Sequence, residues 1–264
     1  MRLFVLAAVL AGAFPFQAAQ SAPIDVSTAV AHCRERRGLI QLSDDQTRLC
    51  FDGEIVKEQD DAPFHALRQH GLFIVRSNGG YPSTAIRLAN ILREKEAMIV
   101  VYDYCLSACA NFFLVASFET YVVKKTVMAW HGNGTRTRCT VQGMEVSRKG
   151  KVQGRQWFPE GKVPPGLAEA CEAARLRDAF FLQRGISDNH LYEPQPLEIR
   201  RRFYLNISQG GDGRGIFWMW HPSNYGNYFK IPITYESYPA NQEEVDQILS
   251  KLGRRAHIIY DPPN

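Results

Sequence analysis

Ser107 and His131 have the residue types and the spacing that nucleophilic catalysis requires. Ser107 directly follows one apolar stretch, and His131 ends another apolar stretch 24 residues later. A histidine within hydrogen-bond reach of a serine can take the hydroxyl proton while the serine oxygen attacks a carbonyl. Gly79 and Gly80 carry no side chains, so their amides can approach a substrate closely and, with the Ala108 amide, stabilise an oxyanion. Their order along the chain predicts an acyl-transfer site.

Each of these features also has a common structural role. A glycine pair after a strand is most often a turn, a serine at a helix start is most often an N-cap, and a lone histidine at a strand end is most often structural. The prediction therefore depends on elements that bring the three segments together.

Strands and helices alternate through the first half of the chain. Hydrophobic periodicity and β-branched content predict strands at 49–56, 72–75, 98–102, 121–123 and 127–130. Helical spacing predicts helices at 62–70, 82–95 and 105–116. Strands joined by such helices form a parallel sheet covered on both faces, with sites at the carboxyl ends of strands. The Gly79-Gly80 turn and the turn at 103–107 both follow predicted strands.

The second half is less regular. Residues 135–165 are polar and predict a loop or a small hairpin insertion, whereas 167–183 and 242–252 predict helices. The glycine-rich turn at 210–215 lacks the Gly-Lys-Ser/Thr of a phosphate loop. The aromatic segment 216–238 predicts a packed surface layer.

Length and composition indicate a globular chain. The 264 residues are 45% hydrophobic, 11% aromatic and 22% charged, enough to bury a core and to exclude wholesale disorder. We expect one domain at 22–264, with a core at about 49–132, an insertion at about 133–166 and a C-terminal helical and aromatic region at 167–264. The formal net charge of +4 is too small to predict a nucleic-acid partner, and the basic runs 148–151 and 200–202 are interpreted as solvated faces.

The first residues predict export. A basic start is followed by the apolar run 3–14 and by small residues at Ala19 and Ser21, as in a secretory signal peptide covering 1–21. No later apolar stretch reaches about 18 residues, so we expect no stable membrane insertion after cleavage. The predicted location is periplasmic or secreted, in a bacterium.

Six cysteines lie after the predicted cleavage site, an even number typical of an oxidising compartment. Sequence alone allows several pairings, and we favour Cys33–Cys50, Cys105–Cys109 and Cys139–Cys171 because each pair brackets a local unit. On a predicted helix, a Cys105–Cys109 bridge requires distortion of the first turn. A zinc site is the rival, but no Cys-x-x-Cys or His-x-x-x-His pattern is present. A free thiol at Cys105 or Cys109 is a rival nucleophile.

The stretch from Phe51 to Gly132 resembles the Clp protease proteolytic subunit and the wider crotonase-like superfamily. Ser77-Asn78-Gly79-Gly80 is similar to that family's Ser-Pro-Gly-Gly oxyanion turn, and 51–55 to its opening strand. Ser107-Ala108 and the stretch 128–131 fall where the family places its nucleophile and its catalytic histidine. The run 105–109 resembles the Cys-x-Ser-Ala-Cys element of secreted Clp-protease-like bacterial proteins. The resemblance implies an α/β fold, a crotonase-like spiral of β-β-α units with a mostly parallel sheet, here with irregular C-terminal additions.

The resemblance also implies a third, acidic catalytic residue after the long helix. Carrying it through 185–187 reaches Glu198, with Asp188 and Glu193 as rivals; the acid could also be absent, leaving a Ser-His dyad. A lysine base, as in signal peptide peptidases of the superfamily, is an open alternative, with Lys124, Lys125 and Lys162 as candidates.

The sequence thus predicts an exported serine hydrolase, peptidase-like, acting on a peptide or protein without cofactor or metal. The alternative is a non-catalytic Clp-protease-like protein that binds a peptide or an envelope partner. Thioester chemistry, as in crotonases, fits poorly with export because coenzyme A esters are cytoplasmic. A homo-oligomer is left open.

Overall fold

A computed structural model describes residues 25–36, 40–131, 135–140, 143–148, 151–157, 165–187, 201, 205, 216–225, 229, 231–254 and 256–262. Side chains between 135 and 167 are not described. The predicted signal peptide at 1–21 and the glycine-rich turn at 210–215 lie outside these residues. None of the described helices has both the length and the apolar character that a bilayer span requires.

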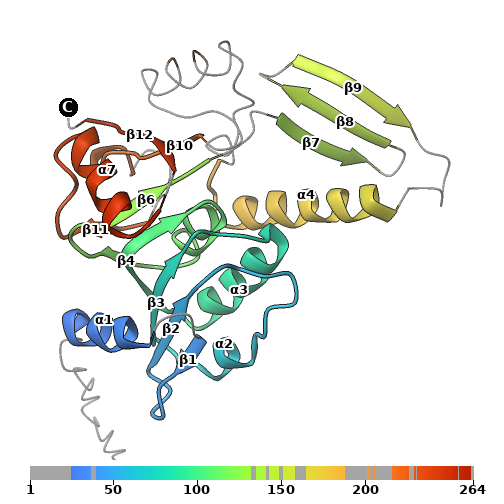
Figure 1. Ribbon diagram of the computed structural model, residues 1–264. Coiled ribbons are helices and arrows are strands. Elements are labelled where there is room, and N and C mark those ends of the chain that lie inside the picture. Colours follow the sequence, from blue (N-terminus) through green and yellow to red (C-terminus); the bar gives the residue numbers. More distant parts are fainter. Residues whose placement is uncertain are drawn as a thin grey trace, which may run out of the picture.

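A seven-stranded sheet forms the centre of the molecule (Figure 1). Its strands are β1 (Ile40–Leu42), β2 (Arg48–Asp52), β3 (Leu72–Ser77), β4 (Met98–Leu106), β5 (Thr120–Val122) and β11 (Ile233–Tyr235), in that order, and β6 (Val127–Ala129) also pairs with β4. Only the β1–β2 pair is antiparallel within this sheet. The prediction of an α/β fold with a mostly parallel sheet is therefore confirmed.

Helices cover both faces of this sheet because its strands are apolar on both sides. On β4, Ile99 and Val101 point into the same core as α3 (Pro82–Glu94), whereas Val100 and Tyr102 pack with α1 (Val26–Glu35). The first face also receives α2 (Ala62–Ala66), the π-helix η1 (Cys109–Phe113) and α4 (Pro165–Gln183). The second face receives α7 (Gln242–Lys251), whose N-cap Asn241 accepts from the Glu244 N–H. Burial on both faces explains the continuous apolar runs of the central strands.

An ion-pair network ties together the carboxyl ends of the central strands. Arg76 on β3 donates from Nε (2.7 Å) and Nη2 (2.5 Å) to Asp52 on β2. Its Nη1 donates to Asp103 on β4 at 3.0 Å, and Arg34 of α1 donates to the other oxygen of Asp103 at 2.9 Å. Asp52 and Arg76 are buried, so their charges depend on this pairing.

Several predicted boundaries were wrong for local reasons. The strand predicted at 49–56 ends at Asp52, where Gly53 adopts a positive φ, and the helix predicted at 62–70 ends at Ala66. The strands predicted at 72–75 and 98–102 extend to Ser77 and Leu106. The helix predicted from Cys105 begins later, because Cys105 and Leu106 hydrogen-bond to β6 as strand residues. The predicted helices at 82–95, 167–183 and 242–252 are confirmed within two residues.

The predicted insertion forms a three-stranded antiparallel sheet, which is more than a loop or a single hairpin. It consists of β7 (Thr135–Thr140), β8 (Gly143–Arg148) and β9 (Lys151–Trp157), and it lies beside α4, outside the central sheet (Figure 1).

The aromatic segment does not form the predicted surface layer. Trp218, Trp220, Tyr225 and Phe229 are buried in the main core, and Trp220 and Phe229 pack against the ring of Trp130. This segment contains β10 (Ile216–Trp218), which pairs with β12 (His257–Ile259), and the short helix η3 (Pro222–Asn224). The buried aromatic rings fix the chain that leads into His131.

Candidate active site

Parallel pairing of β4 with β6 brings Ser107 and His131 together. The register places Leu106, the last residue of β4, opposite Ala129, the last residue of β6. Ser107 therefore leaves the sheet next to Trp130, and His131 follows by one residue. Ser107 Oγ and His131 Nε2 form a hydrogen bond, and both residues are partly exposed. Ser107 and His131 are 24 residues apart in the sequence, but they meet because the chain between them crosses over and returns as the strand next to β4.

The Ser107 backbone is held in a conformation that serine rarely adopts. Its φ is +56°, in the left-handed region, which costs a non-glycine residue about 1–2 kcal/mol. The Ser107 N–H donates to the Ala129 carbonyl at 3.1 Å, and the Ser107 carbonyl accepts from the Asn111 N–H at 2.8 Å. Helical geometry begins only at Ala108, so Ser107 occupies a tight turn between strand and helix. Five other non-glycine residues also have a left-handed φ (Gln46, His70, Glu96, Asp103 and Lys125), so the strain at Ser107 supports a functional role only together with its contact to His131.

The Gly79-Gly80 turn lies directly against this serine turn. Ser77 of β3 pairs with Cys105 of β4. Gly79 and Ser107 each lie two residues further along their chains, so these two residues are neighbours as well. A Cβ on Gly79 would lie 2.6 Å from the Leu106 carbonyl oxygen and 2.7 Å from both the Ala108 nitrogen and the Ser107 Cβ. Only glycine permits this approach, and its φ of +87° independently favours glycine.

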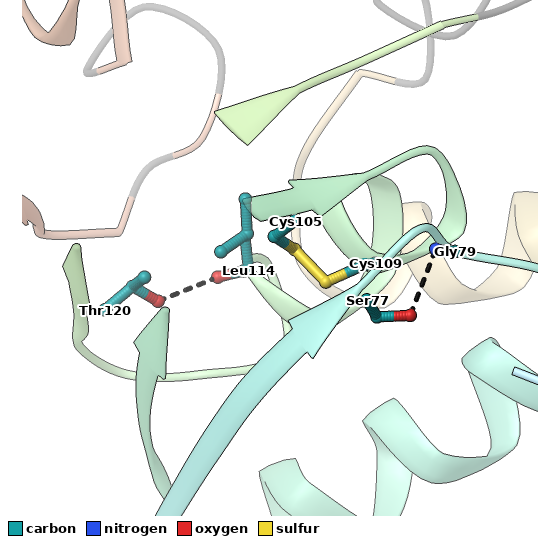
Figure 2. The surroundings of a disulfide bond; sticks show 6 residues. All are labelled: Ser77, Gly79, Cys105, Cys109, Leu114 and Thr120. Carbon is teal, nitrogen blue, oxygen red and sulfur yellow. Dashed lines mark hydrogen bonds between the residues drawn. A yellow bond between two sulfur atoms is a disulfide. The ribbon is translucent and has the colours of Figure 1, made fainter. Parts of the chain in front are cut away.

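The two glycine amides have different roles. The Gly79 N–H donates to Ser77 Oγ at 3.0 Å, as Figure 2 shows, so it is already engaged. The Gly79 carbonyl accepts from the Ile55 N–H at 2.8 Å. A trans peptide points its C=O and N–H in opposite directions, so the Gly80 N–H points away from the Ile55 N–H that donates to the Gly79 carbonyl. The Ala108 N–H is at the start of a helical segment, where N–H groups have no intrahelical acceptor.

His131 is held in a largely apolar environment. Burial lowers the pKa of its imidazole below the ordinary value of 6.5, so the ring is neutral at neutral pH and Nε2 can accept the Ser107 proton. The Phe217 ring lies 4.7 Å from the His131 ring, centroid to centroid. Trp130 and Trp218 exchange two backbone hydrogen bonds, of 2.9 and 2.8 Å, which fix the β10 segment beside the histidine.

No carboxylate of the described residues pairs with the His131 ring. The predicted acids Glu198, Glu193 and Asp188 all lie outside the described residues, as does Lys162. Lys124 is an ion-pair partner of Glu236, 3.9 Å away, and also donates its N–H to that carboxylate at 3.1 Å.

The described cysteines form disulfides. Cys33–Cys50 and Cys105–Cys109 are bridged as predicted, so neither Cys105 nor Cys109 is a free thiol nucleophile. The distorted helical turn expected for the second pair is absent, because Cys105 is a strand residue of β4 and only Cys109 is helical, with Cα atoms 5.4 Å apart. Cys171 is disulfide-bonded, and the side chain of Cys139, its predicted partner, lies outside the described side chains. Among the described residues, no group of three or more His, Cys, Asp or Glu side chains could hold a metal ion.

A groove of about 840 Å³ between α3 and α4 begins beside the Gly79-Gly80 turn. Tyr81, which directly follows Gly80, lines this groove and hydrogen-bonds to Glu169 of α4. Lys57 pairs with the same carboxylate at 2.9 Å. The hydrogen bond from Tyr81, followed by that from Lys57, lowers the pKa of Glu169. The groove wall next to Gly80 thus includes an exposed polar contact between Tyr81 and α4.

Sequence reasoning missed two contributors to this site. Phe217 covers the His131 ring, but it lies far along the chain in a segment interpreted as a surface layer. Asn111 fixes the Ser107 carbonyl through its backbone N–H, which no side-chain pattern reveals. Neither contact leaves a motif in the sequence, because ring packing and main-chain bonding tolerate many residue types.

Comparison with known proteins gives no assignment. No protein-family model matches the chain, and no curated protein sequence matches it.

Proposed function

We propose that the protein is a serine hydrolase of peptide bonds, with Ser107 as nucleophile and His131 as general base and then general acid. The observation that carries this proposal is the hydrogen bond between Ser107 Oγ and His131 Nε2 at the end of two parallel strands. The left-handed φ of Ser107 and the close approach of Gly79 support it further.

The proposed reaction proceeds in two halves. Ser107 Oγ attacks the substrate carbonyl carbon while its proton moves to His131 Nε2, and the C=O pair moves onto the oxygen. The Gly80 and Ala108 amides donate to this oxyanion, which collapses to an acyl-serine as the amine leaves with the His131 proton. Water then attacks the acyl-serine carbonyl and gives a proton to His131, which returns it to Ser107 Oγ as the bond between this oxygen and the acyl carbon breaks and the acid is released.

The proposal includes the fold and the residue roles that the resemblance to the Clp protease proteolytic subunit implies. We propose a crotonase-like spiral of β-β-α units, in which the Ser-Asn-Gly-Gly turn and the Cys-x-Ser-Ala-Cys element supply the oxyanion amides and the nucleophile. The acid that orients His131 is proposed to be Glu198, with Glu193 or Asp188 as alternatives. A peptide substrate follows from this resemblance, and the groove of about 840 Å³ that Tyr81 lines is proposed to receive part of it.

The proposed place of action is the periplasm or the extracellular medium. Disulfides persist in oxidising compartments, and two of them are present among the described cysteines. A hydrolase in that place would meet exported or extracellular proteins and peptides as substrates.

Covalent labelling tests the proposal. The oxidised protein should react with a fluorophosphonate probe at Ser107, and both Ser107→Ala and His131→Ala should abolish the reaction. Ser250→Ala, which changes an exposed serine of α7, is the matched control and should label like the wild type. A folded, oxidised protein that never labels would overturn the proposal. Cleavage of a peptide mixture, followed by mass spectrometry, then separates a peptidase from an esterase.

The second candidate function is a non-catalytic protein that retains the fold to bind a peptide or an envelope partner. No carboxylate of the described residues orients the His131 ring, and the acids proposed for that role lie outside those residues. This alternative predicts that peptides bind the wild type and Ser107→Ala equally and are recovered intact. Cleavage by the wild type alone would contradict it.

A further inference from the structure

The Cys105–Cys109 disulfide encloses the candidate nucleophile. Cys105 is a strand residue of β4, paired with β3 on one side and with β6 on the other, and Cys109 is the first residue of η1. Figure 2 shows the bridge beside Ser77 and Gly79, the residues that form the oxyanion turn. The bridge therefore ties the end region of the central strand to the helix that follows, and Ser107 lies midway between the two cysteines in the sequence.

We propose that the Cys105–Cys109 disulfide is a positioning device that holds Ser107 in its left-handed conformation, with the hydroxyl against His131. This inference rests on the proposed function, because the position of Ser107 matters for catalysis only if Ser107 is the nucleophile.

The conformation of Ser107 is the reason why such a device is needed. A serine at φ +56° is more stable in the right-handed or extended regions, and rotation toward either would carry Oγ away from Nε2. Two hydrogen bonds oppose this rotation, from the Ser107 N–H to Ala129 and from the Asn111 N–H to Ser107. The disulfide joins two residues that are four apart in the sequence, so it restrains both ends of the turn that contains Ser107. Few other backbone conformations of this turn are compatible with the bridge.

The second disulfide provides a matched comparison. Cys33–Cys50 joins α1 to β2 across 17 residues, and its cysteines are as buried as Cys105 and Cys109. Because a longer closed loop stabilises a fold more, removal of Cys33–Cys50 should lower the stability more than removal of Cys105–Cys109. If both bridges only stabilised the fold, Cys33→Ala/Cys50→Ala would be the more damaging change for activity as well.

The experiment compares these two double variants with the oxidised wild type, at a temperature where near-ultraviolet circular dichroism shows all three to be folded. For Cys105→Ala/Cys109→Ala we expect the maximal rate of fluorophosphonate labelling to fall by about a hundredfold, the effect of a nucleophile misplaced by about 1 Å, with probe affinity unchanged. Cys33→Ala/Cys50→Ala should label at the wild-type rate. Equal labelling by all three proteins would overturn the inference.

A second readout does not depend on catalysis. The nitrogen chemical shift of His131 Nε2 reports its hydrogen bond to Ser107, so this shift should change in Cys105→Ala/Cys109→Ala and stay constant in Cys33→Ala/Cys50→Ala. If the wild type never labels, the proposed function fails, and this shift alone decides the positioning role. An unchanged shift would overturn it.

Partial reduction of the wild type covers the case in which Cys105→Ala/Cys109→Ala does not fold. Peptide mapping by mass spectrometry follows each bridge, and the His131 shift and the labelling should both change in step with reduction of Cys105–Cys109. If they follow reduction of Cys33–Cys50 instead, the inference is wrong.

Discussion

Replacement of Gly79 by alanine tests the contact between the glycine turn and the serine turn. The added Cβ would meet the Leu106 carbonyl oxygen at 2.6 Å and the Ala108 nitrogen at 2.7 Å, and it would also crowd the Ser107 Cβ. Two of these atoms belong to the backbone, so no flexible side chain can yield. The φ of +87° adds the strain of placing a side chain in a left-handed conformation, about 1–2 kcal/mol. Overpacking of a tight contact adds about 1–3 kcal/mol.

The two contributions predict that Gly79→Ala lowers the free energy of unfolding by about 2–5 kcal/mol. A domain of ordinary stability, about 5–15 kcal/mol, tolerates this loss in water at room temperature. Urea unfolding of the oxidised protein measures it. Fluorophosphonate labelling of the folded variant should also slow markedly, because any relief of the contact displaces the Ser107 turn.

Gly253→Ala is the matched control for the backbone contribution. Gly253 also has a positive φ, of +66°, but a Cβ there meets nothing within 4 Å. We expect this variant to lose only the strain of about 1–2 kcal/mol and to label normally. If Gly79→Ala costs no more than Gly253→Ala, or labels like it, then the inferred contact between the two turns is wrong.

Two further changes test the site and its support. Burial lowers the pKa of His131 below 6.5, so labelling should rise with pH through a midpoint below 6.5, and a midpoint above 6.5 would contradict a buried neutral base. Because the unfolded chain binds more protons between the lowered pKa and 6.5, the free energy of unfolding should rise with pH across that window, and less so in His131→Gln. Arg76→Leu removes the guanidinium that neutralises the buried Asp52 carboxylate and should cost about 3–5 kcal/mol by urea unfolding. Arg87→Leu breaks a more exposed pair with Asp61 and should cost at most about 1 kcal/mol, so equal losses would contradict the role of burial.

Much of the fold could be predicted because it depends on local patterns. The apolar runs around 72–75 and 98–102 are strands because only strands buried on both faces are so continuously apolar, and helical spacing of apolar residues predicts the helices found at α3 and α7. The boundaries at Cys105 and Leu106 were wrong because their helical propensity is outweighed by hydrogen bonds to β6. The burial of Trp218 and Trp220 was also missed, since an aromatic side chain suits a core and a surface layer equally well.

The sequence by itself determined which groups are available: a serine after a buried strand, a histidine at the end of another, a glycine pair, and cysteines spaced for local bridges. The positions of these groups after strands and in turns follow from residue types and short-range periodicity, both of which can be read directly from the sequence. Only the tertiary structure decided that β6 pairs with the distal half of β4 and places His131 against Ser107, that Gly79 touches the serine turn, and that Phe217 covers the histidine. Strand register and the packing of distant segments depend on the free energy of the whole core, so no local pattern specifies them.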